Sequence, residues 1–245
     1  MIPSAQLTPS DVLWSYTGVR PLPYSPAGPT SDISRRHVVH HHTADPVPVR
    51  GLLSVVGGKL TTFRSLAQDV TDDVLGKTVG GRLGRRRQRS TTTTTRLPGA
   101  QTRDFNAFRQ RYRATSALPP EVADRLLSLY GTRAVEVEGL IGLEPDLIRP
   151  IEGVPGLTAA EVVFALRTEA AVTLSDLVAR RIMTGVGGDL GRDSLVQVAE
   201  VAAAEVGWSD SRVADEVSAY LTYIQKLNPR ARPPVSRTAA DAALG

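Results

Sequence analysis

The chain of 245 residues contains no cysteine. Disulfide bonds, thiolate nucleophiles and metal centres with cysteine ligands are therefore excluded, and the absence fits a reducing compartment. No apolar run approaches the roughly 18 residues that a membrane-spanning helix needs. The first residues, MIPSAQLTPSDVLW, lack the basic stretch and apolar core of a secretory signal peptide. From these absences we expect a cytoplasmic protein.

Acidic residues are missing from one long stretch of the chain. Between Val74 and Arg103 there is no Asp or Glu, while eight Lys and Arg residues fall there. The formal net charge of the whole chain is +4, so the remainder is net acidic. The basic character indicated by a pI near 9.7 therefore belongs to one segment and not to the whole surface.

The first third of the chain predicts short extended segments and one longer unit. Proline and turn residues dominate 1–50, and the patterns of Val12–Tyr16 and His37–His42 favour strands. Gly51–Val56 is typical of a buried strand that ends at two glycines. Leu60–Leu75 follows with apolar residues at helical spacings of three and four. We therefore predict a strand, a glycine turn and a helix.

The pattern from residue 104 to 227 is helical throughout. Helices are predicted at Asp104–Arg113, Pro120–Tyr130, Arg133–Leu143, Ala159–Thr184, Leu195–Val206 and Arg212–Leu227. Thr158 and Glu161 form the pattern of a capping box at the start of the longest helix. The fold class is therefore α+β. The predicted divisions are a strand-containing domain at 1–77, a basic linker at 78–103, an all-α domain at 104–229 and a disordered tail at 230–245.

The glycine turn has the chemistry of an anion site. A helix N-terminus presents unpaired amides and about half a positive charge, and Gly57 and Gly58 allow a ligand to approach the backbone. Lys59 adds a charge, while Thr61 and Thr62 add hydroxyl groups. A tight turn with a capping threonine and a solvated lysine explains the same residues without any ligand.

Four segments of the chain, in order, resemble FAD-dependent glycerol-3-phosphate dehydrogenases. VVGGKLTTFR (Val55–Arg64) is similar to that family's GGKLTTYR segment, with Phe63 in place of the tyrosine. The others are WSYTGVRPL (Trp14–Leu22), DISRRHVV (Asp32–Val39) and AAEVVFALRTEAAVTLSDLVARR (Ala159–Arg181). The resemblance runs from Pro9 to Asn228 and implies the C-terminal portion of such a protein. The strand-containing domain would then be the remnant of an FAD- and substrate-binding domain.

The resemblance also implies roles for particular residues. The cofactor-binding residues would be Gly57, Gly58, Lys59, Leu60, Thr61 and Thr62, lying against the flavin. Arg20 and Arg35 would bind the substrate phosphate, because a guanidinium group can donate two parallel hydrogen bonds to it. Without the resemblance, both would be interpreted as ordinary surface arginines. Arg36 stands where the family commonly has aspartate. No catalytic residue is assigned, because the family's usual proton-accepting histidine is expected to lie in a region that this chain lacks.

The function implied by the resemblance is oxidation of sn-glycerol 3-phosphate to dihydroxyacetone phosphate. FAD would be the cofactor, and electrons would pass to a quinone or another acceptor on the inner face of the membrane, which the protein would contact peripherally. An oxidase that uses oxygen is the alternative within the family. Residues 1–50 contain no G-x-G-x-x-G fingerprint for the FAD pyrophosphate. We therefore expect the N-terminal half to be absent, and the chain alone to bind FAD weakly and to lack activity.

The charged residues of Ala159–Arg181 are expected to form salt bridges within the helical domain. No metal site is expected at the histidines of residues 37–42, because strand alternation turns His41 away from His40 and His42 and only Asp45 supplies a nearby carboxylate. The alternative function is a helical interaction module whose basic arm, Arg82–Arg89, binds anionic lipid or nucleic acid. Nucleic acid is not expected, since aromatic residues are missing around the arm.

Overall fold

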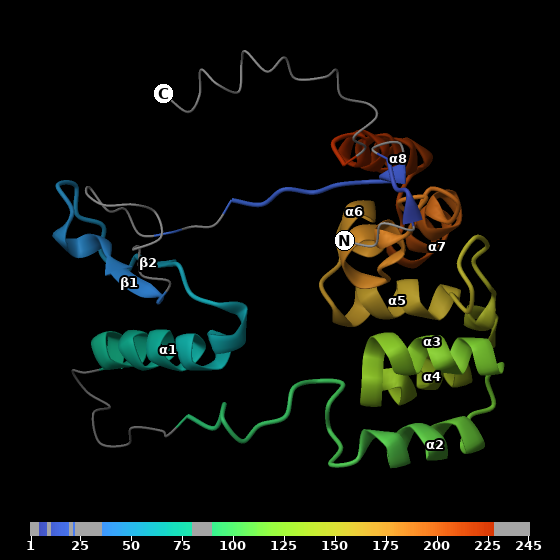
Figure 1. The fold of residues 1–245 in the computed structure, drawn as a ribbon, viewed down its shortest axis with the longest axis horizontal. Coiled ribbons are helices and arrows are strands. Elements are labelled where there is room, and N and C mark those ends of the chain that lie inside the picture. Colours follow the sequence, from blue (N-terminus) through green and yellow to red (C-terminus); the bar gives the residue numbers. More distant parts are fainter. Residues whose placement is uncertain (1–4, 9–10, 20–21, 23–35, 80–89, 228–245) are drawn as a thin grey trace. The chain divides into compact units, whose positions relative to one another are not determined.

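The computed structural model describes residues 5–8, 11–19, 22, 36–79 and 90–227. The chain forms two compact units, one made of Met1–Tyr16 with Leu97–Gly245 and the other of Thr17–Arg96. Within the described ranges the protein is mostly helical and has one small sheet (Figure 1), which confirms the α+β class. Arg20, Arg35 and the arm Arg82–Arg89 lie outside the described residues. The expected domain boundaries at 77, 103 and 229 stay predictions.

The smaller unit is built from a hairpin and a helix. Strands β1 (Val38–His41) and β2 (Leu53–Val56) pair antiparallel, with Val38 opposite Val56. A short 3-10 turn, η4 (His42–Ala44), follows β1, and another, η5 (Leu60–Thr62), leads into helix α1 (Phe63–Val79). The predicted strand, glycine turn and helix are therefore all present.

Two strand predictions are wrong. Gly51–Val56 was expected to be buried, yet β2 is shorter, Val55 is 39% exposed, and no described residue of the smaller unit is buried. A two-stranded sheet with one helix cannot cover both of its faces. Val12–Tyr16 forms no strand. Instead Trp14 packs against the larger core of the helical unit, and the Ser15 amide donates to the Leu227 carbonyl oxygen over 2.8 Å.

The larger unit is a stack of helices. Its α-helices are α2 (Phe105–Thr115), α3 (Pro120–Tyr130), α4 (Ala134–Leu143), α5 (Ala159–Thr168), α6 (Leu174–Asp176), α7 (Leu195–Val206) and α8 (Asp210–Gln225). Short turns join them: η6 (Gly131–Arg133), η7 (Pro145–Ile148), the π-turn η8 (Leu177–Arg181) and η9 (Thr184–Val186). The layers follow chain order, from α2 through α3 and α4 to α5 and then to α7 and α8 (Figure 1).

Helix α5 lies between two hydrophobic cores. Ala160 and Phe164 pack with residues of α2, α3 and α4, whereas Val162 and Val163 pack with α7 and α8. Every residue from 159 to 165 is buried, as expected for a helix that is apolar on all sides. Glu161 is part of this run and therefore needs a partner inside the protein.

The long helix predicted at Ala159–Thr184 is broken. Helix α5 ends at Thr168, and Ala170 adopts a left-handed φ of 53°. The capping box is formed by Thr173 and Asp176 at the start of α6 and not by Thr158, whose hydroxyl is buried without a hydrogen-bond partner among the described residues. Two T-x-x-acid patterns occur in this segment, and only the second forms a capping box, because the Glu161 carboxylate pairs with Arg125.

The two threonines are expected to respond differently to loss of the hydroxyl. Thr173→Ala should lower the free energy of unfolding by about 1 kcal/mol, the usual effect of losing an N-cap. Thr158→Val keeps the shape of the side chain and removes an unpaired buried hydroxyl, so no loss is expected. Urea unfolding followed by circular dichroism measures both variants. A larger loss in Thr158→Val than in Thr173→Ala would place the cap at Thr158.

Candidate functional site

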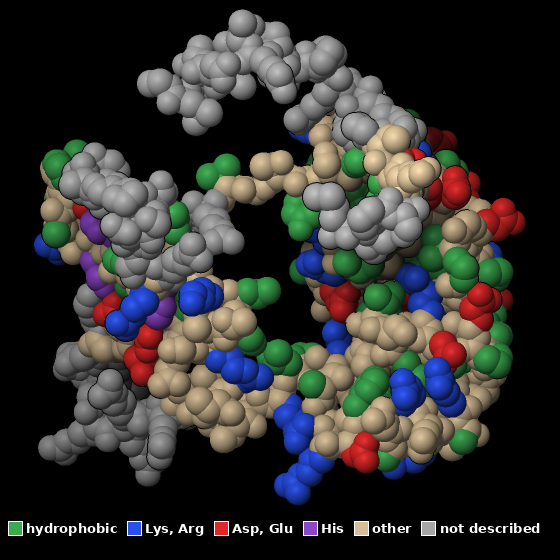
Figure 2. All heavy atoms as spheres, viewed as in Figure 1, with side chains coloured by type: hydrophobic (Ala, Val, Ile, Leu, Met, Phe, Trp, Pro, Cys, Tyr) green, Lys and Arg blue, Asp and Glu red, His purple; other side chains and the backbone are tan. Residues whose placement is uncertain are grey.

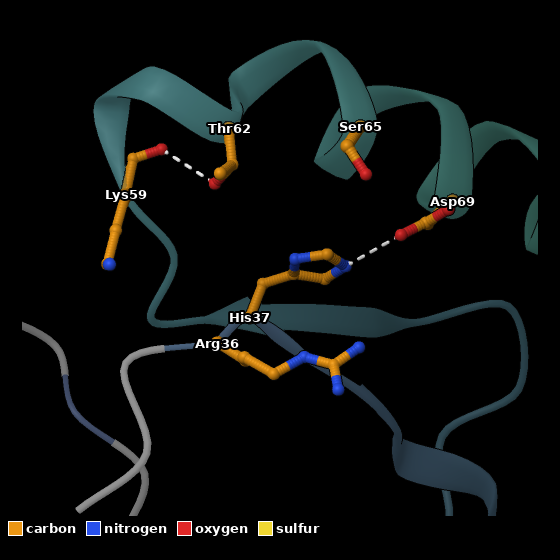
Figure 3. Close-up of a pocket in the computed structure, with 6 residues that line it drawn as sticks. All are labelled: Arg36, His37, Lys59, Thr62, Ser65 and Asp69. Carbon is orange, nitrogen blue, oxygen red and sulfur yellow. Dashed lines mark hydrogen bonds and ion pairs between the residues drawn. The ribbon is translucent and has the colours of Figure 1, made fainter.

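The glycine turn borders a cavity of about 330 Å³ in the smaller unit. The cavity is lined by Arg36, His37, Lys59, Thr62, Ser65 and Asp69 (Figure 3). Of the predicted cofactor-binding residues, Lys59 and Thr62 are part of this wall, while Leu60 is 89% exposed next to them. The predicted turn is therefore where the structure has a recess.

The two glycines of the turn adopt conformations that other residues avoid. Gly57 has a φ of 80° and Gly58 a φ of 93°, values that favour glycine. A side chain at position 58 would also come within 3.0 Å of Leu66 Cδ1. The backbone conformation thus accounts for both glycines without any ligand.

The start of the helix is tighter than predicted. The amide and the hydroxyl of Thr62 both donate to the Lys59 carbonyl oxygen, each over 3.0 Å. The Phe63 amide donates to the Leu60 carbonyl oxygen, which completes a 3-10 turn. Any amide that faces a ligand here therefore belongs to a residue before Thr62. Lys59 is extended and exposed, so its ammonium can approach a bound group.

Two histidines of the hairpin pair with two aspartates of α1. His37 Nε2 lies 3.1 Å from Asp69 Oδ2, and His41 Nε2 binds Asp73 Oδ2. The histidines are four residues apart along a strand, and the aspartates four apart along a helix, so each pair shares one face. Figure 3 shows the His37 ring reaching from the hairpin toward Asp69. These pairs hold the hairpin against the helix that carries the turn.

Arg36, His37, Ser65 and Asp69 line the cavity but were not predicted as site residues. The sequence does contain an indication of this contact: one pair of histidines and one pair of aspartates are each spaced four residues apart, as H-x-x-x-H and D-x-x-x-D. The partners are 32 residues apart in the chain, so the spacings became meaningful only once the hairpin packed on the helix. The cavity wall carries an ammonium, a guanidinium and hydroxyl groups, together with the Asp69 carboxylate that pairs with His37. This donor set fits a carbonyl-rich ring edge, such as that of a flavin, or a phosphate.

Arg64, the last residue of the resembling segment, has a local partner. Its guanidinium donates to the Thr95 carbonyl oxygen over 2.9 Å and also to the Thr92 carbonyl. The threonine run forms a turn in which the Thr95 amide donates to the Thr91 carbonyl oxygen over 2.9 Å. We therefore regard Arg64 as a structural residue that holds the Thr91–Thr95 turn.

The salt bridges expected in the helical unit are confirmed. Arg167 lies 2.6 Å from both Glu144 and Glu205, and the arginine hydrogen bonds lower the pKa of Glu144. The other pairs are Arg133 with Glu169 at 3.1 Å, Arg180 with Asp176 at 2.8 Å and Arg125 with Glu161 at 2.7 Å.

A second cavity, of about 610 Å³, lies in the helical unit. It has carboxylates at Glu144, Asp146 and Glu205 and apolar contacts from Leu147 and Val163. Its acidic lining does not suit a phosphate. No helix in the described ranges is both long and apolar enough to cross a bilayer.

Comparison with known proteins relates most of the chain to enzymes of glycerol 3-phosphate oxidation. The C-terminal domain of alpha-glycerophosphate oxidase matches residues 90–213. Glycerol-3-phosphate dehydrogenase of Synechocystis sp. is 33% identical over 228 residues, which cover 92% of this chain and 40% of that protein. Glycerol-3-phosphate dehydrogenase 2 of Mycobacterium tuberculosis is 32% identical over 223 residues, 89% of this chain and 36% of that protein. The probable mitochondrial glycerol-3-phosphate dehydrogenase of Dictyostelium discoideum is 27% identical over 240 residues, 93% of this chain and 35% of that protein.

The chain thus spans no more than 40% of the length of these relatives. The family match includes helices α2 to α7 in full, and the relatives extend it over the hairpin and the glycine turn. The chain therefore belongs to the family of alpha-glycerophosphate oxidase and glycerol-3-phosphate dehydrogenase, and it corresponds to the C-terminal portion of that family.

Proposed function

We propose that this chain serves as the C-terminal portion of an enzyme that oxidises sn-glycerol 3-phosphate to dihydroxyacetone phosphate with FAD. The observation that carries the proposal is the cavity at the glycine turn, where Lys59 and Thr62 line a recess at the start of α1. The names of the relatives support the choice of substrate.

The substrate requires positive charge at its binding site. A phosphate monoester is close to dianionic at neutral pH, and each charge-assisted hydrogen bond to it contributes about 1.5–3 kcal/mol. Arg36 and Lys59 bring two cationic side chains to the cavity. Arg20 and Arg35, the predicted phosphate ligands, stay part of the proposal.

The turn would serve the cofactor through its electrostatics. A bound FAD would supply the acceptor for the hydride that leaves C2 of the substrate. Residues Gly57 to Thr62 would hold the carbonyl edge of the ring system, with the glycines allowing close approach. The positive end of α1 and the Lys59 ammonium would then stabilise negative charge at that edge. Electrons would pass to a quinone or to another acceptor, in a cytoplasmic enzyme that contacts the inner face of the membrane peripherally.

A hybrid enzyme tests the proposal. The N-terminal portion of the Synechocystis relative is joined to this chain where the two sequences begin to match, and reduction of an artificial electron acceptor is measured. We expect bound flavin and turnover that depends on sn-glycerol 3-phosphate. Lys59→Met should lower kcat/KM about 100-fold, as loss of one electrostatic donor does. Lys226→Met, which removes the lysine that follows α8, is the matched control and should change little.

Two results would count against the proposed function. One is a hybrid that holds FAD and a stable fold yet oxidises no glycerol 3-phosphate. The other is a Lys59→Met hybrid as active as the parent, which would assign the glycine turn a purely structural role. Flavin content, read from the visible absorbance, separates loss of cofactor from loss of chemistry.

A further inference from the structure

The hairpin carries three side chains that can bind a metal ion, those of His40, His42 and Asp45. They lie at the end of β1 that is farther from His37. Nε2 of His40 lies 2.7 Å from one carboxylate oxygen of Asp45, and Nδ1 of His42 lies 2.7 Å from the other. Ligand atoms of all three residues lie within 4.8 Å of one another. The two imidazole rings meet edge to face, with centroids 4.7 Å apart. Figure 2 shows histidine side chains at the surface of this unit.

The third ligand comes from a turn that strand periodicity does not describe. Alternation along β1 directs His40 and His41 to opposite faces, and His41 binds Asp73 of α1. His42, the first residue of η4, lies on the side of His40, with the two rings in contact. The 3-10 turn η4 then folds the chain back, and Asp45 at its end meets both rings. Sequence periodicity alone therefore supplied only two ligands.

The site is held by the hairpin itself. The His42 amide donates to the Leu52 carbonyl oxygen over 3.2 Å, and the His42 carbonyl accepts from the Val49 amide over 3.0 Å. Pro46 follows Asp45 and restricts it to extended backbone, in agreement with its ψ of 159°. Two of the ligands are thus fixed by the backbone.

The surroundings of His42 match those of a metal-bound histidine. A ligating imidazole usually gives its second ring N–H to a fixed acceptor, which sets its tautomer and orientation. Nε2 of His42 lies 2.8 Å from the hydroxyl oxygen of Ser54, on the paired strand β2. With that N–H given to Ser54, the lone pair of Nδ1 faces Asp45 and His40.

We propose that His40 Nε2, His42 Nδ1 and a carboxylate oxygen of Asp45 bind a divalent transition-metal ion such as Zn²⁺. Two imidazoles and one carboxylate suit zinc, nickel or cobalt rather than magnesium or calcium. Metal–ligand bonds of about 2.0–2.2 Å require ligand atoms somewhat over 3 Å apart, so Asp45 moves back by a fraction of an ångström. The His40 side chain is 47% exposed, which gives the ion access. The ion ties η4 to β1 in a unit whose described residues include none that is buried.

Titration of the intact chain with Zn²⁺ tests the site. The protein is first treated with a chelator, and binding is followed by calorimetry and, with Co²⁺ as probe, by visible absorbance. One ion should bind per chain. His40→Ala and His42→Ala should each weaken binding by more than about 100-fold, and Ser54→Ala by about 10-fold, as a lost supporting hydrogen bond does.

The matched control is His41→Ala, which leaves the same number of histidines as His42→Ala but keeps the proposed ligands. Its affinity for Zn²⁺ should equal that of the parent. Asp45→His, which replaces the carboxylate by a third imidazole, should retain the ion and guards against variants that fail only because the hairpin unfolds. Equal losses in His41→Ala and His42→Ala would show unspecific binding to a histidine-rich segment. That outcome, or no binding by the parent chain, would overturn the proposal.

Discussion

Replacing Arg125 by alanine is expected to destabilise the helical unit by about 3–5 kcal/mol, the range found when a buried ion pair loses one partner. Glu161 is fully buried in α5, and Arg125 Nε lies 2.7 Å from its carboxylate. The same guanidinium donates to the Ile182 carbonyl oxygen over 2.8 Å, so it also ties α3 to the end of the π-turn. Burial raises the pKa of Glu161 even with the guanidinium opposing it, and loss of Arg125 removes that compensation.

The control for this variant is another arginine pair of the same unit. Arg113 lies 2.5 Å from Asp124, but both side chains are about half exposed, at 49% and 48%. Exposed pairs contribute at most about 1 kcal/mol, so Arg113→Ala should change stability little. Urea unfolding of the full chain, followed by helical circular dichroism, compares the two. Equal losses of stability in Arg125→Ala and Arg113→Ala would mean that the buried pair with Glu161 contributes no more than the exposed pair.

A further variant separates the pair from the packing around it. Arg125→Met with Glu161→Leu replaces both charges by apolar groups of similar length. Such replacements of buried ion pairs are often neutral or stabilising. We therefore expect the double variant to recover most of the stability that Arg125→Ala loses. Failure to recover would point to the Arg125 hydrogen bond with Ile182 as the larger contribution.

Gly131→Ala is expected to lower the free energy of unfolding by about 3 kcal/mol, from a left-handed backbone and an overpacked contact together. Gly131 follows α3 with a φ of 58°. A Cβ at this position would lie 2.2 Å from the Gly99 carbonyl oxygen. That same oxygen accepts a hydrogen bond from the Thr132 amide over 2.9 Å, so it cannot move away without losing a partner.

Gly139→Ala is the matched control for the glycine variant. Gly139 lies within α4, and a Cβ there would have no neighbour within 4 Å. Alanine in a helix interior is favoured over glycine by roughly 0.5–1 kcal/mol, so the control should be slightly more stable than the parent. Thermal unfolding measures the difference. If Gly131→Ala were also neutral, the contact between Gly99 and the end of α3 would be loose in solution.

Local signals account for the helices that were predicted with the right ends. Helix α3 begins with Pro120 in its first position and ends before Gly131, and α7 ends before Gly207, which has a φ of 71°. Proline at a helix start and glycine after a helix end act through the backbone of a few neighbouring residues. Such features can be read from the sequence because no distant contact changes them.

The errors came where distant contacts decide. The long helix predicted at Ala159–Thr184 instead ends at Thr168, Ala170 takes a left-handed φ of 53°, and Thr173 with Asp176 caps a new helix. Trp14, expected in a strand, packs on the helical core. A pattern of residue types cannot show which of two similar caps forms, or which surface an apolar side chain covers.

By itself, the sequence determined the family, the α+β class, most of the helices and the turn at Gly57–Thr62, because each depends on residues close together in the chain. The tertiary structure decided which side chains meet at that turn and around it. His37 meets Asp69 only after the hairpin has packed on α1, and Asp45 meets His40 and His42 only because the turn η4 folds the chain back. Sites formed this way depend on the distances between atoms of separate elements, and those distances are set by packing and not by spacing along the chain.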